Sequence, residues 1–175
     1  MATEHPMDRT LRWMSENLAG AQRAVHLPGH EDAGKPCTNS GTGIIVCCYI
    51  NALGKVLLKG QGKDHQRFKG FVTQCMQPFL QAGSTKALPP PTKTKKPGGE
   101  EWLYHVYRCG FIHGFYPGNA RWRRSANSRY WTQRGGVTLN IDALVRAFFD
   151  GVEVFRQKAK DDPDLRTNFG KYITK

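Results

Sequence analysis

Two residues of this chain, Arg108 and His113, could together do chemistry on a phosphodiester. Four residues separate them in the segment 107–114. Arginine is a permanent cation that can form two parallel hydrogen bonds to a phosphate. Histidine gains or loses a proton near neutral pH. If both side chains converge on one site, they supply what cleavage without a metal needs, which is a charge for the phosphate and a carrier for a proton.

A basic and aromatic stretch follows this pair and could hold a nucleic acid. Arginine supplies phosphate contacts, and aromatic rings stack on unpaired bases for roughly 1–3 kcal/mol each. The residues predicted to bind RNA are Arg121, Trp122, Arg123, Arg124, Arg129 and Tyr130. The alternative is a solvated loop whose tryptophans pack into the core.

The spacing of Arg108 and His113 predicts a dimer. In one straight α-helix the two residues lie ~140° apart around the axis, so a single helix does not bring them together. Two copies of the helix around a two-fold axis could bring each arginine toward the histidine of its partner. The alternative for His113 is a packed core residue, because it lies in line with Leu103 and Val106 on the apolar side of the helix.

The same helix does not form a metal site by itself. His105, Cys109 and His113 recur every four residues and form a stripe. The two histidines lie ~12 Å apart along the axis, which is too far for one ion to bridge. We therefore expect neither a metal nor another cofactor.

Composition restricts the class of partner. The chain has 175 residues, with 26 Lys and Arg against 14 Asp and Glu, for a net charge of +12. Such a surface attracts polyanions over ~8–10 Å in ordinary salt, so RNA, DNA and an anionic membrane surface are all candidate partners from charge alone. The longest apolar run, Ile44–Ile50, has seven residues, which is too short to cross a bilayer, so no membrane partner is expected. The five cysteines contain no Cys-x-x-Cys pair, which favours reduced thiols in a cytoplasmic protein.

The elements that would position these residues are helical. Apolar residues recur every three or four positions from Leu11 to Val25, and Asp8 is expected to cap this first helix. The segment 44–58 is predicted to be a helix that ends at Gly60 and Gly62, with a buried strand as the alternative for its first residues. Asp64 is expected to cap a third helix, which Pro78 bends or ends.

Three further helices complete the predicted fold. They are a helix over 100–115 that carries the Arg/His pair, a long helix capped by Asn140, and a short helix from Pro163 through Phe169. The expected architecture is therefore an all-α bundle of five or six helices in one domain over 1–175. Mobile loops are expected near 27–41, 82–99 and 117–138.

The Arg-x4-His pattern of Arg108 and His113, on a late helix of a small basic all-α chain, resembles the HEPN superfamily. That resemblance implies a metal-independent endoribonuclease of toxin or defence type, with a composite site at a dimer interface. By this resemblance, His113 would exchange a proton with the ribose 2′-hydroxyl or the leaving oxygen, and Arg108 would stabilise the phosphate charge. An antitoxin or another regulatory protein would be a further partner.

The residue after the arginine departs from the family pattern. Active members often have a polar residue at this position, where this chain has Cys109. Some members of the family are inactive binding modules. The alternative function is therefore a non-catalytic, basic helical module that binds nucleic acid or a partner protein.

Overall fold

A computed structural model describes residues 4–24, 36–81, 99–110, 121–124, 131–132 and 138–174. Their elements are α1 (Pro6–Ala24), α2 (Pro36–Leu57), α3 (Asp64–Cys75), α4 (Gln77–Gln81), α5 (Gly99–Glu101), the π-helix η1 (Trp102–Arg108), β1 (Arg121–Arg123), β2 (Trp131–Thr132), β3 (Thr138–Asn140), α7 (Ile141–Asp161), α8 (Pro163–Thr167) and α9 (Phe169–Thr174). This composition confirms the predicted all-α fold. The helices outnumber the five or six predicted, because several segments expected as one helix are divided into shorter pieces.

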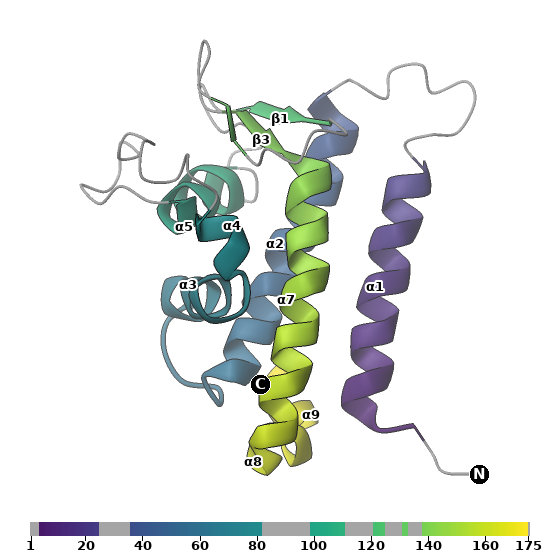
Figure 1. Cartoon of the computed structure of the whole chain (residues 1–175), viewed down its shortest axis with the longest axis vertical. Helices are drawn as coiled ribbons and strands as arrows, with labels where there is room; N and C mark the ends of the chain where they lie inside the picture. The colour runs from purple at the N-terminus through teal and green to yellow at the C-terminus, as the bar shows by residue number, and fades with distance from the viewer. Residues whose placement is uncertain are drawn as a thin grey trace.

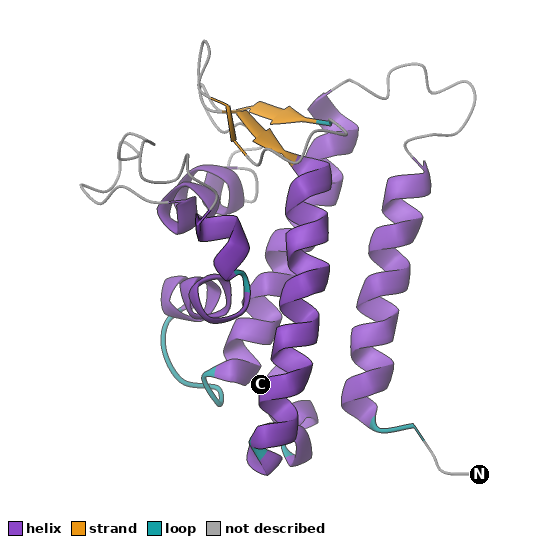
Figure 2. Cartoon of the chain, viewed as in Figure 1, coloured by secondary structure: helices purple, strands orange, loops and turns teal. Residues whose placement is uncertain are grey.

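Three long helices, α1, α2 and α7, run side by side along the molecule (Figure 1). The short helices α3, α4 and α5 pack on one side of them, and α8 and α9 lie at one end (Figure 1). The strands gather at the opposite end, as the colours of Figure 2 show. None of the helices in the described ranges is both long and apolar enough to cross a membrane.

Helix α2 occupies the centre of the bundle. It contacts α1, α3, α7, α9, β1 and η1. Its apolar residues point in every direction, as is typical of a helix buried on all sides. Val46, Ile50 and Leu53 are fully buried, and Ile44 and Tyr49 pack against the core from other sides of the same helix. The prediction of a helix for this segment is confirmed, and the strand alternative is wrong.

Large aromatic side chains fill the space around α2. The fully buried ones include Phe68, Phe71, Phe79, Phe148, Phe155 and Phe169. Cys47 and Cys75 are also buried, and burial raises the pKa of the Cys75 thiol to about 12. This core therefore draws its residues from α2, α3, α4, α7 and α9.

Helices α2 and α3 approach each other very closely at Gly54. A β-carbon placed at Gly54 would lie 2.0 Å from the backbone oxygen of Arg67, so only glycine fits there. The turn between the two helices uses Gly60 and Gly62 with φ of +79° and +77°, a region that favours glycine. The predicted end of α2 at these glycines is confirmed.

Two predicted helix starts need correction. Helix α2 begins at Pro36, so the loop predicted over 27–41 is wrong from residue 36 onward. Proline suits the first turn of a helix, because the N–H that it lacks has no partner there. Helix α3 begins with Asp64 itself rather than being capped by it, and Lys63 precedes the helix. The Lys63 backbone N–H donates to the Gln66 side chain at 2.7 Å.

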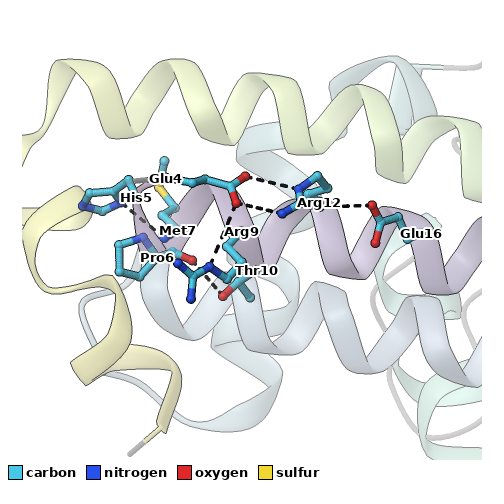
Figure 3. A network of polar contacts seen from close by, with 8 residues as sticks. All are labelled: Glu4, His5, Pro6, Met7, Arg9, Thr10, Arg12 and Glu16. Atoms are coloured by element: carbon cyan, nitrogen blue, oxygen red, sulfur yellow. Dashed lines mark hydrogen bonds and ion pairs between the residues drawn. The ribbon is translucent and has the colours of Figure 1, made fainter. Parts of the chain in front are cut away.

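Asp8 does not cap α1, because the helix already begins at Pro6. The Asp8 carboxylate instead pairs with Arg166 of α8 at 3.0 Å. At the exposed start of α1, Glu4 accepts a hydrogen bond from Arg12 at 2.8 Å (Figure 3). This bond lowers the pKa of the Glu4 carboxyl. These pairs form a polar network on the surface of α1, while the opposite side of the helix faces the core.

The segment predicted as a loop over 117–138 contains a small sheet. Its strand order is β1-β3-β2, with β1 parallel and β2 antiparallel to β3. Trp122 and Trp131 both stand opposite Leu139. The strands have two or three residues each, so none is long enough to show the two-residue alternation that identifies a strand in a sequence. The loop prediction is therefore wrong for these residues.

A side chain caps each of the helices α7 and α8. The Asn140 side chain accepts hydrogen bonds from the backbone N–H groups of Asp142 and Ala143, which confirms it as the cap of α7. Asp162 caps α8 in the same way, and Pro163 is its first residue. The short helix predicted through Phe169 is divided, because α8 ends at Thr167 and α9 begins at Phe169.

Candidate functional site: the interface between α3 and the π-helix

The helix predicted over 100–115 is helical to residue 110, and residues 111–115 lie outside the described ranges. Its centre, Trp102–Arg108, is a π-helix rather than the expected α-helix. A π-helix forms i→i+5 hydrogen bonds, and such segments occur frequently at functional sites. The changed winding alters which residues of Trp102–Arg108 share a side of the helix. The ~140° expected between Arg108 and His113 stays a prediction, because His113 lies outside the described residues.

Three cross-helix pairs join this segment to α3, and we call them the α3–η1 interface. The pairs are Lys69 with Glu101, Phe68 with Tyr104, and Asp64 with Arg108. From one pair to the next, the residue number decreases along α3 and increases along the segment from Glu101 to Arg108, so the two helices are antiparallel. An ion pair therefore lies at each end of the interface, with an aromatic contact between them.

Arg108 is fixed at one end of the interface. Its Nη2 donates to Asp64 Oδ2 at 2.9 Å, and its guanidinium lies 5.5 Å from the centre of the Tyr104 ring. Nη1 also lies 3.8 Å from the sulfur of Cys109. Only 12% of the Arg108 side chain is exposed. Burial alone lowers the pKa of Arg108, but Cys109, Tyr104 and Asp64 raise it above its ordinary value. The side chain is therefore a cation held in one orientation.

Tyr104 is the aromatic centre of the interface. The ring is buried and meets His65 of α3 at 6.2 Å and His105 at 4.9 Å, both edge to face. Burial raises the pKa of the Tyr104 hydroxyl, and Cys109 raises it further. Two imidazoles and the Arg108 guanidinium thus surround one ring.

Glu101 is a buried carboxylate with two basic neighbours. Its side chain is 7% exposed, and Oε1 pairs with Lys69 Nζ at 2.5 Å. His105 Nε2 lies 3.3 Å from the other oxygen, Oε2. A buried carboxylate is stable only when charge and hydrogen bonds compensate for lost water. Lys69 supplies that compensation at Oε1, whereas Oε2 has no hydrogen-bond partner among the described residues.

The structure describes only part of the predicted site. Arg108 lies at the α3–η1 interface, while His113, Arg129 and Tyr130 lie outside the described residues. The convergence of Arg108 and His113 therefore stays a prediction. Arg121 lies in β1, at the end of the molecule that carries the sheet.

Two of the residues predicted to bind RNA have partners inside the protein. The Trp122 ring packs 4.6 Å from the Tyr107 ring and directly against Gly43, where an added β-carbon would lie 2.4 Å from it. Arg124 Nη1 donates to Asp142 Oδ1 of α7 at 3.0 Å. Arg123, between them, is exposed. Stacking of Trp122 on a base would require the indole to leave this packing. Arg123 is exposed, so it can contact a phosphate without any rearrangement.

Apart from Arg108, the members of the α3–η1 interface were not predicted from the sequence to form a site. His105 was assessed only as a metal ligand, and Glu101, four residues earlier, was not linked to it. Their spacing of four residues was a usable signal, because residues four apart on a helix are neighbours. Lys69, Asp64 and His65 carried no such signal, because their partners are distant in the sequence. In the described ranges, no group of three or more His, Cys, Asp or Glu is arranged to hold a metal ion.

Comparisons of the chain with protein-family models, with curated proteins and with solved structures found no match.

Proposed function

We propose that this chain is a metal-independent endoribonuclease in which Arg108 stabilises the phosphate charge and His113 carries a proton. The observation that carries the proposal is the fixed orientation of Arg108 between Asp64 and Tyr104. A cation that is already oriented does not have to reorganise as charge develops in the transition state, which is how electrostatic catalysis acts. Asp64 and Tyr104 are then positioning residues for the arginine.

The proposed substrate is RNA, held by charge. The net charge of +12 favours a polyanion, and the exposed Arg123 lies in the stretch that also contains Arg121, Arg129 and Tyr130. Phosphate contacts from such residues position a nucleic acid without reading its sequence. The ribose 2′-hydroxyl would be the nucleophile, so single-stranded DNA should be bound and not cut.

The proposal includes a homodimer, in which the Arg108 of one protomer works with the His113 of its partner. It also includes a cytoplasmic location and, following the resemblance to toxin and defence nucleases, an antitoxin or other regulatory protein as a partner. Sedimentation of the purified protein with and without RNA tests the dimer, because a monomer at micromolar concentration under both conditions would contradict it.

The decisive experiment is incubation of the purified protein with single-stranded RNA in EDTA. Cleavage that survives chelation, with a 2′,3′-cyclic phosphate at the new end, is the expected result. His113→Ala should lower the rate by ~10²–10⁴, the usual loss for a positioned acid–base group. Arg108→Ala should have a similar effect. A melting curve for each variant separates lost chemistry from lost fold, and a folded, fully active His113→Ala would refute the assignment.

A non-catalytic RNA-binding module is the second candidate, and one observation favours it. Asp64 pairs directly with Arg108, so the carboxylate competes with a phosphate for the guanidinium. Asp64→Asn distinguishes the two functions. If Asp64 positions a catalytic arginine, the variant should cut RNA more slowly. If Asp64 only limits binding, the variant should bind RNA more tightly, and neither protein should cut it.

A further inference from the structure

Trp13 of α1 lies on the surface of the bundle. Among the described residues, Trp13 and Val154 are the two large apolar side chains that are exposed, Trp13 to 56%. The indole packs against Tyr49 of α2, with 6.1 Å between the ring centres, and Tyr49 packs in turn against the buried Phe148. The core therefore supports one side of the indole, while more than half of its surface meets water. Burial of such a surface against a partner is favourable, and tryptophan is enriched among the residues that contribute most to protein interfaces.

Trp13 belongs to a row of four residues along α1. Arg9, Arg12, Trp13 and Glu16 are spaced by three, one and three positions, so they share one side of the helix. Each of them is more than half exposed. We call these four residues the α1 stripe. Helix α1 and helix α3 lie on opposite sides of α2 and α7 (Figure 1), so the α1 stripe and the α3–η1 interface belong to different sides of the molecule.

The charges on this surface balance each other. Arg12 donates to Glu4 at 2.8 and 3.2 Å and to Glu16 at 3.5 Å, and Arg9 lies 4.0 Å from Glu4 (Figure 3). Two arginines and two glutamates together carry no net charge, on a chain whose total charge is +12. A neutral surface gives a polyanion or an anionic membrane no electrostatic reason to bind there. The partner that fits has charges of both signs in matching positions.

A second copy of this chain has charges in matching positions. In a two-fold symmetric interface, residue i of one protomer contacts residue j of its partner, and j contacts i. Consider two antiparallel copies of α1 with the two-fold axis between positions 12 and 13. Arg9 then lies opposite Glu16 of the partner subunit, and Arg12 lies opposite the partner's Trp13. Both favourable pairs therefore arise in the same register, and each occurs twice.

The contact between Arg12 and the partner's Trp13 uses surfaces that are still open. The nitrogens of Arg12 donate to Glu4 and Glu16 within the protomer, which occupies the edges of the guanidinium and leaves its flat faces available. A guanidinium face stacks favourably on an aromatic ring, and most strongly on an indole. The pairs within one protomer and the contact between protomers can therefore exist together.

We propose that two copies of this chain associate through the α1 stripe, as antiparallel helices with the two-fold axis between Arg12 and Trp13. The inference does not depend on the proposed ribonuclease function. Trp13 lies at the centre of this interface, and the pairs between Arg9 and Glu16 lie at its rim. Four residues per protomer cover less than the ~800 Å² per partner of a standard interface, so we expect a weak dimer that forms at micromolar concentration.

The test combines two variants that each reverse one charge, Arg9→Glu and Glu16→Arg. Each variant alone places like charges opposite each other twice per dimer, so its self-association should be ~10-fold weaker than that of the unchanged protein. When the two variants are mixed in equal amounts, every reversed charge meets an opposite charge on the other variant. The mixture should therefore associate as tightly as the unchanged protein. Sedimentation equilibrium at low ionic strength, where exposed charges are least screened, measures both affinities.

Trp13→Ala tests the centre of the interface and should weaken self-association by roughly 30-fold or more, as expected for a central tryptophan. Because Trp13 also packs against Tyr49, a melting curve is measured for this variant. If its melting temperature is lowered, the mixture of the two charge variants decides, since exposed ion pairs contribute little to stability. Arg146→Glu is the matched control, because it reverses the charge of an exposed arginine on α7. It should associate as the unchanged protein does.

Three results would overturn the proposal. The first is equal self-association of the unchanged protein and both charge variants. The second is an unchanged protein whose mass never exceeds that of Trp13→Ala. The third is an unchanged protein that does not self-associate but binds vesicles of anionic phospholipid through Trp13, because this result would assign the surface to a membrane.

The same measurements separate this interface from the dimer proposed for catalysis. A dimer formed through Arg108 and His113 would raise the mass of every α1 variant equally and would not respond to charge reversal on α1. Cleavage of RNA is measured separately, so failure of either proposal leaves the other standing.

Discussion

Replacement of Gly54 by Ala tests the close approach of α2 and α3 on which the α3–η1 interface depends. The new β-carbon would lie 2.0 Å from the backbone oxygen of Arg67, and real β-carbons essentially never come closer than 3.0 Å to another heavy atom. The oxygen belongs to a helix backbone and cannot rotate away, so the two helices must separate by about 1 Å. A gap of that size removes a quarter to a half of the dispersion energy of the atoms beside it.

The expected change follows from two opposing terms. Alanine favours the helix over glycine by about 1 kcal/mol. Overpacking a well-packed core costs ~1–3 kcal/mol, and a clash with backbone belongs at the upper end of that range. Gly54→Ala should therefore lower the free energy of unfolding by ~2 kcal/mol, as measured by urea denaturation followed by circular dichroism.

A second glycine provides the control. Nothing lies within 4 Å of a β-carbon placed at Gly20 of α1. Gly20→Ala should therefore keep the propensity gain and raise the free energy of unfolding by ~0.5–1 kcal/mol. If both variants are stabilised equally, α2 and α3 do not meet at Gly54 as described, and the placement of Asp64 opposite Arg108 loses its support.

Three further predictions concern other parts of the fold. Gly43→Ala should displace the Trp122 ring from its packing. In a protein whose other tryptophans are all replaced by Phe, this should shift the fluorescence of Trp122 to the red, and an unchanged spectrum would contradict the packing. Asn140→Ala should lower the free energy of unfolding by ~1 kcal/mol, because α7 loses its cap, and Asn140→Asp, which can still cap, should lose less. Lys59 lowers the pKa of Asp164 below its unfolded value of 3.8, so this pair stabilises the fold above about pH 3.8 and ceases to do so as the pH falls through the folded pKa. Below that pH, the melting temperature of the Asp164→Asn variant should therefore fall less steeply than the melting temperature of the unchanged protein. Parallel curves for the two proteins would refute the pairing.

The sequence predicted the features that depend on local patterns. The apolar repeats, the Asn140 cap and the Gly60–Gly62 turn are each decided within a few residues, so they could be identified from the chain alone. The start of α2 was placed too late, because Pro36 belongs to a segment whose composition is typical of a loop. Proline within the first turn of a helix and proline in a loop are the same signal in a sequence.

The features that the sequence did not reveal depend on distant partners. Asp64 and Arg108 are 44 positions apart, and nothing in either neighbourhood identifies the other as its partner. Trp122 could have been a stacking surface or a packed residue, and only the presence of Gly43 beneath the ring decides which. The strands β1, β2 and β3 form because they pair with one another, and each alone is too short to be recognised.

The winding of η1 has a consequence for how this chain tolerates changes of length. Glu101 and Arg108 are seven positions apart, and both must face α3 to reach Lys69 and Asp64. Deleting one residue within Trp102–Arg108 would allow the segment to close as an ordinary α-helix, and would also rotate one end of it away from its partner. Both ion pairs therefore depend on the number of residues between Glu101 and Arg108. The number of residues in η1 should be more strictly constrained than the identity of most of those residues.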